Sequence, residues 1–399
     1  MRCTAIDENR QIIATSKQDL PLPENPQAGW FEQDPESWWS ATQTSLQQLL
    51  QKIAVARVKA ISIDATSSTV LLIDEDNQPV SKGLMYNDSR SSIVIDQLEQ
   101  FVAEGNITLS ASSSLAKAVY LLESSSNDSA RYIAHQADWI SSKLSGKTAV
   151  SDESNCLKLG YDSINRKWPE WLQNAPFDVY KKLPSVFPTG SRVGNIEPGM
   201  AEVFKLPAET AVIAGTTDST ASTLATGIND LGQAVTTYGS TLVMKVIAGS
   251  PVTSVKDGVY SHRLPGGRWL VGGASKSGGN VLLKYFSVEQ IQKLSMQMKP
   301  ENDTGFNYYP LAGKGERFPE NNPGKLPRLY PRPESDAEFL QGIFEGFAMI
   351  EKLAYEKMAE LGAPMPTEIL SAGGQATENQ ALTEIRSRVL AIPILKAVH

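Results

Sequence analysis

The stretch from Ala214 to Val243 constrains this chain more than any other part of the sequence. It starts at the end of the apolar run 211–214 and continues into Gly215-Thr216-Thr217-Asp218-Ser219, where one carboxylate stands among small residues and hydroxyls. An apolar run followed by such residues is typical of a strand that ends in a tight turn before a helix. A carboxylate in that turn is a candidate general base, and a helix cap is an equally good interpretation of Asp218.

The second half of this stretch predicts a hairpin. Tyr238-Gly239-Ser240-Thr241 lies between the β-rich runs 234–237 and 242–247. Consecutive backbone amides in a glycine turn can form a concave positive nest that binds an anion. We therefore predict that Gly239, Ser240 and Thr241 bind nucleotide phosphate, and a plain hairpin turn remains the alternative.

Two further glycine pairs resemble this turn. Gly272-Gly273 and Gly373-Gly374 each come after a predicted strand, so we expect strand-to-glycine turns there that could line one cleft with amides. The chain contains neither the G-x-x-x-x-G-K-[ST] nor the G-x-G-x-x-G pattern. A P-loop or a dinucleotide-binding fold is therefore disfavoured.

Length and charge limit the classes of partner. With 399 residues the chain can form two domains, and we place their boundary near Gly227, giving 1–226 and 227–399. A net charge of −7 without a basic block makes nucleic acid an unlikely partner. No apolar run is long enough to span a bilayer, and two distant cysteines fit a reducing compartment. We expect a cytoplasmic protein with small-molecule ligands, as a monomer or homodimer.

Other patterns carry weaker signals. Asp64 precedes Thr66 and Ser67, whose hydroxyls could contact a polyol, although turn formation explains the spacing better. Ser114-Leu115-Ala116-Lys117 matches S-x-x-K without the companion motifs of that site, so we interpret it as helix surface. Asp88 and Arg90 could form a local ion pair of little energetic value if exposed. Three histidines without G-x-S-x-G do not support a serine hydrolase.

The flanking pattern predicts the remaining elements. We expect a hairpin over 2–15, a helix that Asp34 caps with Pro35 in its first turn, and helices over 115–122 and 134–144. Nearer the C-terminus we expect a long helix over 336–361, a strand over 369–372, a helix from about Asn379 and a last strand over 390–395.

Four motifs in this order resemble the FGGY family of carbohydrate kinases across nearly the whole chain. They are Gly29-Trp30-Phe31-Glu32-Gln33-Asp34-Pro35 with Trp38-Trp39, Tyr86-Asn87-Asp88-Ser89-Arg90, Gly215-Thr216-Thr217-Asp218-Ser219 and Tyr238-Gly239-Ser240-Thr241. Four variants are similar to the cyanobacterial and plant-plastid subgroup, described as D-ribulose kinases or labelled xylulose kinases. These are Ile63-Asp64-Ala65-Thr66-Ser67, Gln136-Ala137-Asp138-Trp139, Lys158-Leu159-Gly160-Tyr161 and Gly315-Glu316-Arg317-Phe318-Pro319.

The resemblance implies an α/β protein with two actin-like (ribonuclease H-like) ATPase domains, each a mixed sheet flanked by helices, with an interdomain cleft. Sugar would bind mostly to the first domain, and ATP with Mg²⁺ mostly to the second. Asp218 matches the catalytic aspartate of the family, which accepts the proton of the sugar hydroxyl. Ser67 matches a sugar-contacting serine of the subgroup. No residue is assigned to a metal.

The resemblance also implies which residues contact ATP. Gly239, Ser240 and Thr241 match the second phosphate loop, and Gly273 matches another turn on the phosphate side. Gly373 and Gly374 match the adenosine motif. That motif has one residue more here than in close relatives, so either Glu378 or Asn379 faces adenine, and we take Asn379 as the contact.

Two departures from the family concern the ends of the chain. The family opens with a strand and a phosphate loop similar to D-F-G-T-S-G, whereas Arg2–Ile6 matches the segment immediately after that loop. The family also continues past the last strand with a helix, and this sequence stops at His399. We therefore expect that both ends are cut and that the chain as written has little kinase activity.

The leading hypothesis is an ATP-dependent kinase that phosphorylates a ketopentose. D-Ribulose is the expected substrate, and D-xylulose is the alternative. A relative that binds sugar or nucleotide without catalysis is a second hypothesis. An actin-like polymer or a chaperone ATPase is a third, and the sugar-side motifs argue against it.

Overall fold

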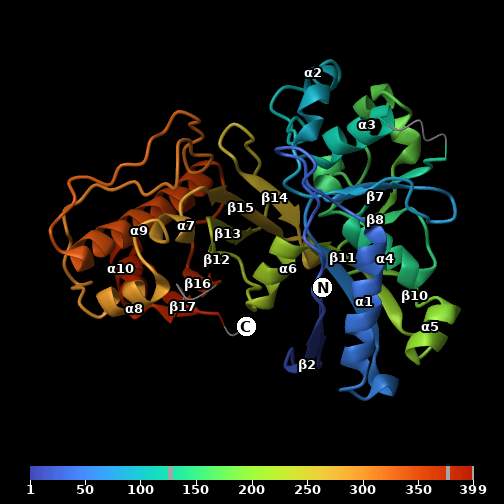
Figure 1. Ribbon diagram of the computed structural model, residues 1–399, viewed down its shortest axis with the longest axis horizontal. Helices are drawn as coiled ribbons and strands as arrows, with labels where there is room; N and C mark the ends of the chain where they lie inside the picture. Colours follow the sequence, from blue (N-terminus) through green and yellow to red (C-terminus); the bar gives the residue numbers. More distant parts are fainter. Residues whose placement is uncertain (125–128, 374–377, 398–399) are drawn as a thin grey trace. The chain divides into compact units, whose positions relative to one another are not determined.

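The computed structural model describes residues 1–124, 129–373 and 378–397. The chain divides into two compact units, Met1–Ala221 and Ser222–His399, which we call unit 1 and unit 2 and describe separately. Figure 1 labels many of their helices and strands. Among the described residues, no helix combines the length and the apolar character needed to cross a bilayer.

Unit 1 contains several small sheets and the helices that cover them. Its strands are β1 (Arg2–Ile6), β2 (Ile12–Lys17), β3 (Glu32–Gln33), β4 (Ala60–Ala65), β5 (Val70–Ile73), β6 (Gly83–Leu84), β7 (Tyr132–His135), β8 (Val150–Asp152), β9 (Ser185–Phe187), β10 (Arg192–Asn195) and β11 (Ala211–Thr217). Its helices are α1 (Pro35–Leu50), α2 (Ile95–Leu98), α3 (Ser114–Ser124), α4 (Gln136–Ser145) and α5 (Pro198–Phe204), while α6 (Asp218–Ala225) continues into unit 2.

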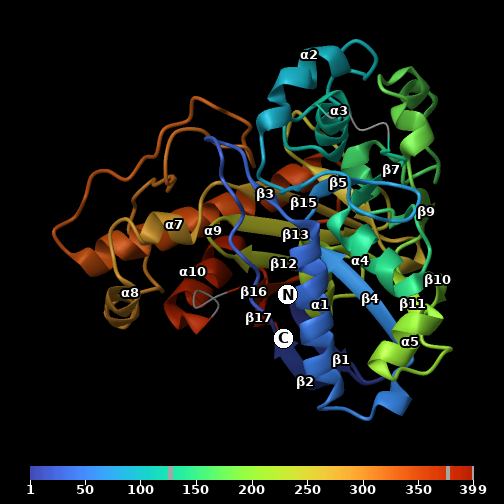
Figure 2. The ribbon, with the colours of Figure 1, turned by 45° about the vertical axis from the view of Figure 1, so that its right-hand side comes forward.

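The sheet that matters for function has the order β10-β11-β4. β11 is antiparallel to β10 and parallel to β4, with Thr216 opposite Asp64. Figure 2 shows β4 and β11 side by side, and α4 packs on both strands. Because the two strands are parallel, their carboxyl ends and the residues after them lie at the same edge of the sheet.

Two predictions for unit 1 that rest on neighbouring residues are confirmed, the start of helix α1 and the N-terminal hairpin. Asp34 caps α1 by accepting a hydrogen bond from the N–H of Glu36 at 3.1 Å, and Pro35 is the first helical residue. The N-terminal hairpin forms as predicted, with β1 antiparallel to β2. Residues 134–135, by contrast, belong to strand β7, and the predicted helix starts only at Gln136, after His135 has acted as its cap.

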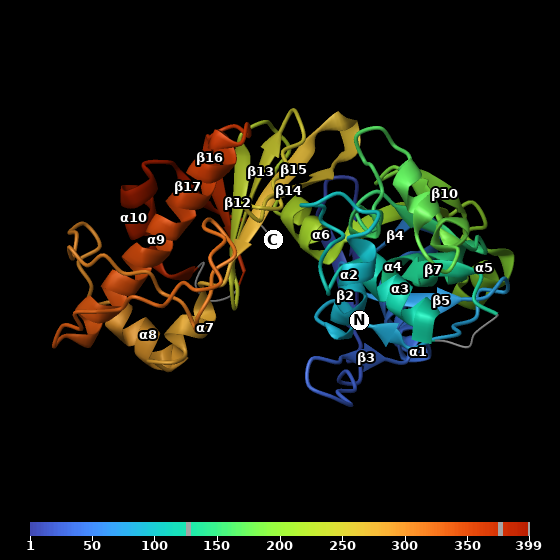
Figure 3. The ribbon, with the colours of Figure 1, turned by 90° about the horizontal axis from the view of Figure 1, so that it is seen from above.

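Unit 2 is one mixed six-stranded sheet with the order β14-β15-β13-β12-β16-β17. Its strands are β12 (Gln233–Tyr238), β13 (Leu242–Ala248), β14 (Tyr260–Arg263), β15 (Trp269–Ser275), β16 (Glu368–Ala372) and β17 (Ile394–Lys396), and its helices are α7 (Gly279–Leu282), α8 (Val288–Ser295), α9 (Asp336–Glu360) and α10 (Gln380–Leu390). Within this unit, α9 and α10 pack together beside the strands (Figure 3), and α9 buries its phenylalanines against β12, β13 and β15.

Two predictions for unit 2 are wrong. Gly272 and Gly273 lie inside strand β15, where they pair with Lys245 and Met244, and do not form a turn. A Cβ atom on Gly273 would come within 2.7 Å of the buried Phe318 ring, so glycine is needed there for packing against that ring. Residues 390–395 are not one strand either, because α10 continues to Leu390 and β17 begins at Ile394.

Candidate active site

Asp218 stands where the sequence places it, directly after β11 and at the first residue of α6. Its side chain is half-buried, and one carboxylate oxygen accepts a hydrogen bond from the N–H of Ser219 at 2.6 Å. At the same sheet edge, Asp64 is the second-last residue of β4. The parallel pairing of β4 with β11 therefore brings two carboxylates together from distant parts of unit 1.

The pKa of Asp64 reflects the proximity of the two carboxylates. Protein atoms crowd its carboxyl group although the residue is exposed at the surface, and this loss of solvent raises its pKa. The Asp218 carboxylate raises the pKa of Asp64 further, because two neighbouring negative charges repel. Such a pair attracts protons and cations to this edge of the sheet.

Ser67 lies in the turn after β4 at this edge. The neighbouring hydroxyl groups of Thr66 and Thr69 are 2.6 Å apart, and Thr66 lies 3.3 Å from the amide oxygen of Gln136. Ser68 is buried and adopts a left-handed backbone conformation with φ of 63°. The structure therefore brings Ser67, Asp64 and Asp218 to one edge of the sheet.

The S-x-x-K segment is not helix surface, which corrects the sequence prediction. Ser114 and Lys117 on α3 are both fully buried. Ser114 pairs with His135 Nε2 at 3.0 Å, and His135 Nδ1 pairs with Asp138 at 2.7 Å. This Ser–His–Asp chain is enclosed by protein, so it stabilises the junction of β7 and α4 and cannot meet a substrate.

Asp88 and Arg90 form the predicted ion pair, but the pair is buried and not exposed. Asp88 is fully buried, accepts the N–H of Phe31 at 2.6 Å and pairs with Arg90 at 2.8 Å. Arg90 also pairs with Glu32 at 2.7 Å and lies over the ring of Trp30. Two of the recognised motifs, the one at 29–35 and the one at 86–90, are thus held together by charge.

In unit 2 the predicted hairpin is present. Tyr238 pairs with Leu242, so Gly239, Ser240 and Thr241 form the turn between β12 and β13. A Cβ atom on Gly239 would meet only the carbonyl oxygen of Thr241, at an unstrained 3.6 Å. Neither its backbone conformation nor internal crowding requires glycine there, and the absence of a side chain leaves the turn open to close approach from outside.

The amides of this turn are partly available. The Gly239 N–H donates to the carbonyl oxygen of Thr241 at 3.1 Å, whereas the N–H groups of Ser240 and Thr241 donate to no other described residue. The carbonyl oxygen of Gly239 accepts the N–H of Gly279 at 2.9 Å. Gly279 comes directly after Gly278, whose φ of 144° only glycine adopts readily. This supporting turn was missed from the sequence because the preceding pair, 272–273, gave the more obvious glycine signal.

Gly373 joins this edge of unit 2. It comes directly after β16, which is parallel to β12 with Ala372 opposite Thr237, and its φ of 87° marks a left-handed turn. Gly239 and Gly373 therefore succeed adjacent parallel strands at the same edge. Gly374 lies outside the described residues. Gly273 is inside the sheet, so the structure does not place it in a phosphate-binding turn.

A pocket of about 380 Å³ lies in unit 2, between α8 and the start of α10. Both Glu378 and Asn379 line it, together with Gln292, Ser295, Met296, Met298, Pro300, Gln380, Ala381 and Glu384. Asn379 caps α10 by accepting the N–H of Leu382 at 3.1 Å, and its amide donates to Ser295 at 2.7 Å. The methionines and Pro300 give it an apolar wall, and the amides and carboxylates give a polar one, a mixture that is typical of small-molecule pockets.

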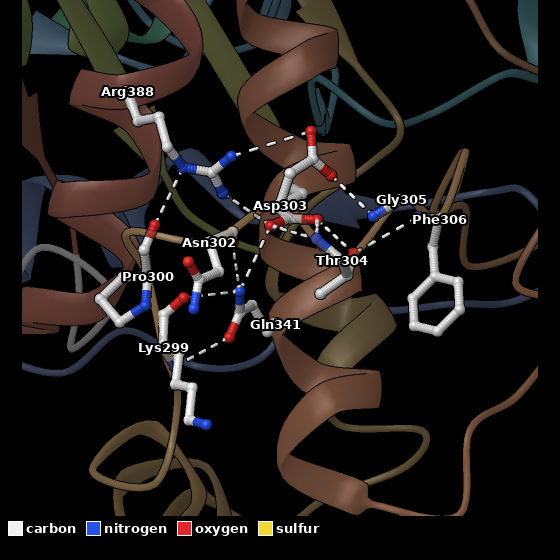
Figure 4. Close-up of polar contacts among 10 residues, drawn as sticks. Lys299, Pro300, Asn302, Asp303, Thr304, Gly305, Phe306, Gln341 and Arg388 are labelled. Atoms are coloured by element: carbon white, nitrogen blue, oxygen red, sulfur yellow. Dashed lines mark hydrogen bonds and ion pairs between the residues drawn. The ribbon is translucent and has the colours of Figure 1, made fainter.

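The apolar wall is fixed by a polar network on α9 and α10, which Figure 4 shows. Gln341 accepts the N–H of Lys299 and donates to the carbonyl oxygens of Lys299 and Asn302. Arg388 donates to the carbonyl oxygen of Pro300 at 2.9 Å and pairs with Glu345 at 2.6 Å. The loop that carries Pro300 therefore has a defined position at the pocket.

A second network lies under the two glycine turns of unit 2. Glu351 on α9 is fully buried and pairs with Arg386 of α10 at 2.7 Å. It also accepts the hydroxyl of Tyr238 at 2.9 Å, and Arg386 donates to Ser371. Tyr238 directly precedes Gly239, and Ser371 lies two residues before Gly373. One ion pair thus supports both turns.

Within the described residues, no cluster of three or more histidines, cysteines, aspartates or glutamates could hold a metal ion by itself. Mg²⁺ in nucleotide sites commonly takes one or two carboxylates together with phosphate oxygens and water. Asp64 and Asp218 fit that pattern. The sequence prediction did not include Asp64 among the candidate site residues, although its place at a strand end before a run of hydroxyls was a usable signal.

Comparison with known proteins gives one consistent result. Residues 1–225 match the N-terminal domain of the FGGY family of carbohydrate kinases. A xylulose kinase of Klebsiella pneumoniae is 24% identical over 362 residues, covering 87% of this chain and 74% of that protein. A glycerol kinase of Aquifex aeolicus is 24% identical over 439 residues, covering 100% of this chain and 84% of that protein.

Solved structures agree on the fold. The gluconate kinase from Lactobacillus acidophilus superimposes with a TM-score of 0.85 at 16% identity, covering 99% of this chain and 83% of that one. The xylulose kinase from Rhodospirillum rubrum gives a TM-score of 0.83 at 19% identity, covering 98% of this chain and 83% of that one.

Proposed function

Because the chain belongs to the FGGY family of carbohydrate kinases, and so is a phosphotransferase with an alcohol acceptor, we propose that it transfers the terminal phosphate of ATP to a ketopentose. Its fold is that of these kinases, two actin-like α/β units. D-Ribulose is the proposed acceptor, because the motifs around Ser67 and Asp138 are similar to those of the D-ribulose kinase subgroup. D-Xylulose is the alternative, since several relatives are named xylulose kinases. We propose the cytoplasm as its compartment.

The observation that carries the proposal is the carboxylate pair at the edge of β4 and β11. In the proposed reaction Asp218 accepts the proton of the attacking sugar hydroxyl, and Ser67 binds a hydroxyl of the same sugar. Phosphoryl transfer requires alignment and charge neutralisation more than covalent help, so one positioned base suffices. Asp64, whose pKa is raised beside Asp218, would attract positive charge to the site. Bound Mg²⁺ would neutralise phosphate charge.

Unit 2 would bind the nucleotide. The amides of Ser240 and Thr241 suit phosphate oxygens, and Gly239 leaves space for their close approach. The pocket lined by Asn379 suits adenine, because it pairs an apolar wall with amide groups. Gly373 would contact the nucleotide between the phosphate-binding turn and the adenine pocket. Gly273 makes no direct contact in this proposal, since the Phe318 ring packs against it.

The test compares the wild type with Asp218→Asn, which retains the shape of the side chain and removes the base. Each is measured as the 399-residue chain and as a chain extended upstream with a phosphate loop. ATP is offered with D-ribulose, D-xylulose, glycerol and D-gluconate, and ADP release is measured. Loss of a positioned base lowers kcat by about 10²–10⁴. ATP binding, followed by calorimetry, should not change. Glu209→Gln, an exposed carboxylate of the same unit, is the matched control and should keep full activity.

The outcomes separate the hypotheses. ADP release that depends on a ketopentose and is lost in Asp218→Asn supports the proposal, and the preferred sugar decides between D-ribulose and D-xylulose. Calorimetric binding of D-ribulose without any ADP release, both by the 399-residue chain and by the chain extended upstream, favours the non-catalytic relative. Full activity of Asp218→Asn would refute the base assignment.

A further inference from the structure

Lys117 is a buried basic residue that the proposed reaction does not use. It lies on α3, its exposed fraction is 0%, and it belongs to the S-x-x-K segment that sequence reasoning set aside. A lysine almost never occupies such a position without a partner for its charge. Here the partners are not carboxylates but two backbone carbonyl groups, which indicates a specific structural task.

The two carbonyl groups belong to different turns. Lys117 Nζ donates to the carbonyl oxygen of Ser68 at 2.8 Å and to that of Met85 at 2.7 Å. Ser68 comes directly after Ser67, and Met85 directly precedes the Tyr86–Arg90 motif. One amine therefore joins the turn after β4 to the turn that carries Asp88 and Arg90.

The chemistry of the amine matches this pair of acceptors. Burial lowers the pKa of Lys117 to about 7, while the nearby Asp88 opposes that shift. A neutral amine has two N–H groups, and the site offers two carbonyl oxygens. Ser68 also needs support, because its left-handed backbone conformation is unfavourable for a residue with a side chain.

We propose that Lys117 is a positioning residue of the sugar site, which fixes the Thr66–Ser68 turn against the Met85–Arg90 turn and thereby sets the place of the Ser67 hydroxyl. The inference rests on the proposed function, since it assigns the sugar to the edge where Ser67 and Asp218 lie. Lys117 acts through these turns and touches no substrate itself.

The test uses Lys117→Met, which fills a similar volume without a donor, and Lys117→Gln, which keeps a shorter donor. Ser114→Ala is the control on the same helix, because Ser114 contacts His135 and neither turn. We expect Lys117→Met to raise the KM for the ketopentose at least tenfold while the KM for ATP stays within twofold. Lys117→Gln should fall between it and the wild type, and Ser114→Ala should match the wild type in both constants.

Amide hydrogen exchange gives a readout that does not depend on activity. We expect faster exchange in Lys117→Met at residues 66–69 and 85–89, with the rest of unit 1 unchanged. If Lys117→Met fails to fold, Lys117→Gln is measured in the same way. An unchanged KM for the sugar in a folded variant, or faster exchange spread evenly over unit 1, overturns the inference.

Failure of the proposed function looks different. A wild type that neither binds nor phosphorylates a ketopentose contradicts the kinase assignment and the role of these turns in a sugar site. A wild type that is active, with sugar KM and local exchange both unaffected by Lys117→Met, contradicts only the role of Lys117.

Discussion

Each unit buries a basic side chain beside two turns of the proposed site, but the two units compensate for the burial differently. In unit 2, Arg386 keeps its charge and pairs with the buried Glu351. In unit 1, Lys117 contacts no carboxylate of the described residues and donates to two carbonyl groups. An ion pair depends on its partner, whereas an amine can release its proton. The stability of unit 2 is therefore sensitive to the loss of a partner, and that of unit 1 is sensitive to pH.

The pKa values reflect this difference. Burial is the largest single influence on Arg386 and lowers its pKa, but Glu351 together with Tyr238 and Tyr355 raises the pKa, so the net direction is upward. For Lys117 burial prevails and the pKa falls to about 7. The carbonyl groups of Ser68 and Met85 accept from the amine in either protonation state, which allows Lys117 to serve without a counter-charge.

The largest effect is expected from Arg386→Met. It leaves Glu351 charged, buried and without its main partner, and breaking a buried pair in this way costs about 3–5 kcal/mol of unfolding free energy. Urea unfolding measures the loss. The double variant Arg386→Met/Glu351→Leu should recover most of it, because no unpaired charge remains. A loss below about 1 kcal/mol in the single variant would contradict the comparison.

Lys117→Met should destabilise less, by about 1–3 kcal/mol, because two buried carbonyl groups lose a donor while the cost of burying an amine disappears. The measurement is the same urea unfolding series. Lys181→Met, an exposed lysine of unit 1, is the matched control and should show no measurable change. A loss as large as that of Arg386→Met would contradict the comparison, because Lys117→Met leaves no partner of an ion pair buried without its counter-charge.

The pH dependence sharpens the comparison. The pKa of Lys117 is about 7 in the folded chain and near the ordinary lysine value when unfolded. Between these values the unfolded chain binds more protons, so the wild type gains stability with rising pH, by at most about 1.4 kcal/mol per pH unit. The difference in unfolding free energy between wild type and Lys117→Met, measured from pH 7 to 9, should show this slope. Arg386→Met should retain it, and a flat difference would contradict it.

Arg388 is an intermediate case and gives the smallest expected effect. Its side chain is 26% exposed, and it pairs with Glu345 while it holds Pro300 at the pocket wall. A pair that is partly in water contributes little to stability, on the order of 1 kcal/mol or less. We expect Arg388→Met to weaken ATP binding a few-fold in calorimetry with a near-normal unfolding midpoint. Arg332→Met, which removes an exposed pair with Asp336, should leave ATP binding unchanged.

Local chemistry made much of this fold predictable. The cap at Asp34, the hairpin at Gly239 and the long helix of unit 2 arise from signals within a few residues, and all three are confirmed. The junction of β11 with α6 at Asp218 was predictable for the same reason. The boundary near Gly227, the roles of the site residues and the expectation that both ends are cut stay predictions.

The errors arose where a distant contact decides the outcome. The local pattern at position 273 predicts a turn, but the Phe318 ring, far along the chain, explains the glycine. The charge of Lys117 predicts a surface position, and the two carbonyl groups that bury the residue belong to other turns. The proximity of Asp64 and Asp218 likewise depends on a strand pairing that no local pattern reveals.

That pairing also has a consequence for how the protein is made. Thr210, just before β11, contacts Val58, just before β4, across 152 positions of the chain. Ribosomes add about 5–20 residues per second, so β4 emerges on the order of ten seconds before its neighbour. A nascent chain halted before residue 211 has one of the two acidic groups and an open strand edge that other chains can join. Pauses in translation over this interval would therefore lower the yield of active protein without any change in its sequence.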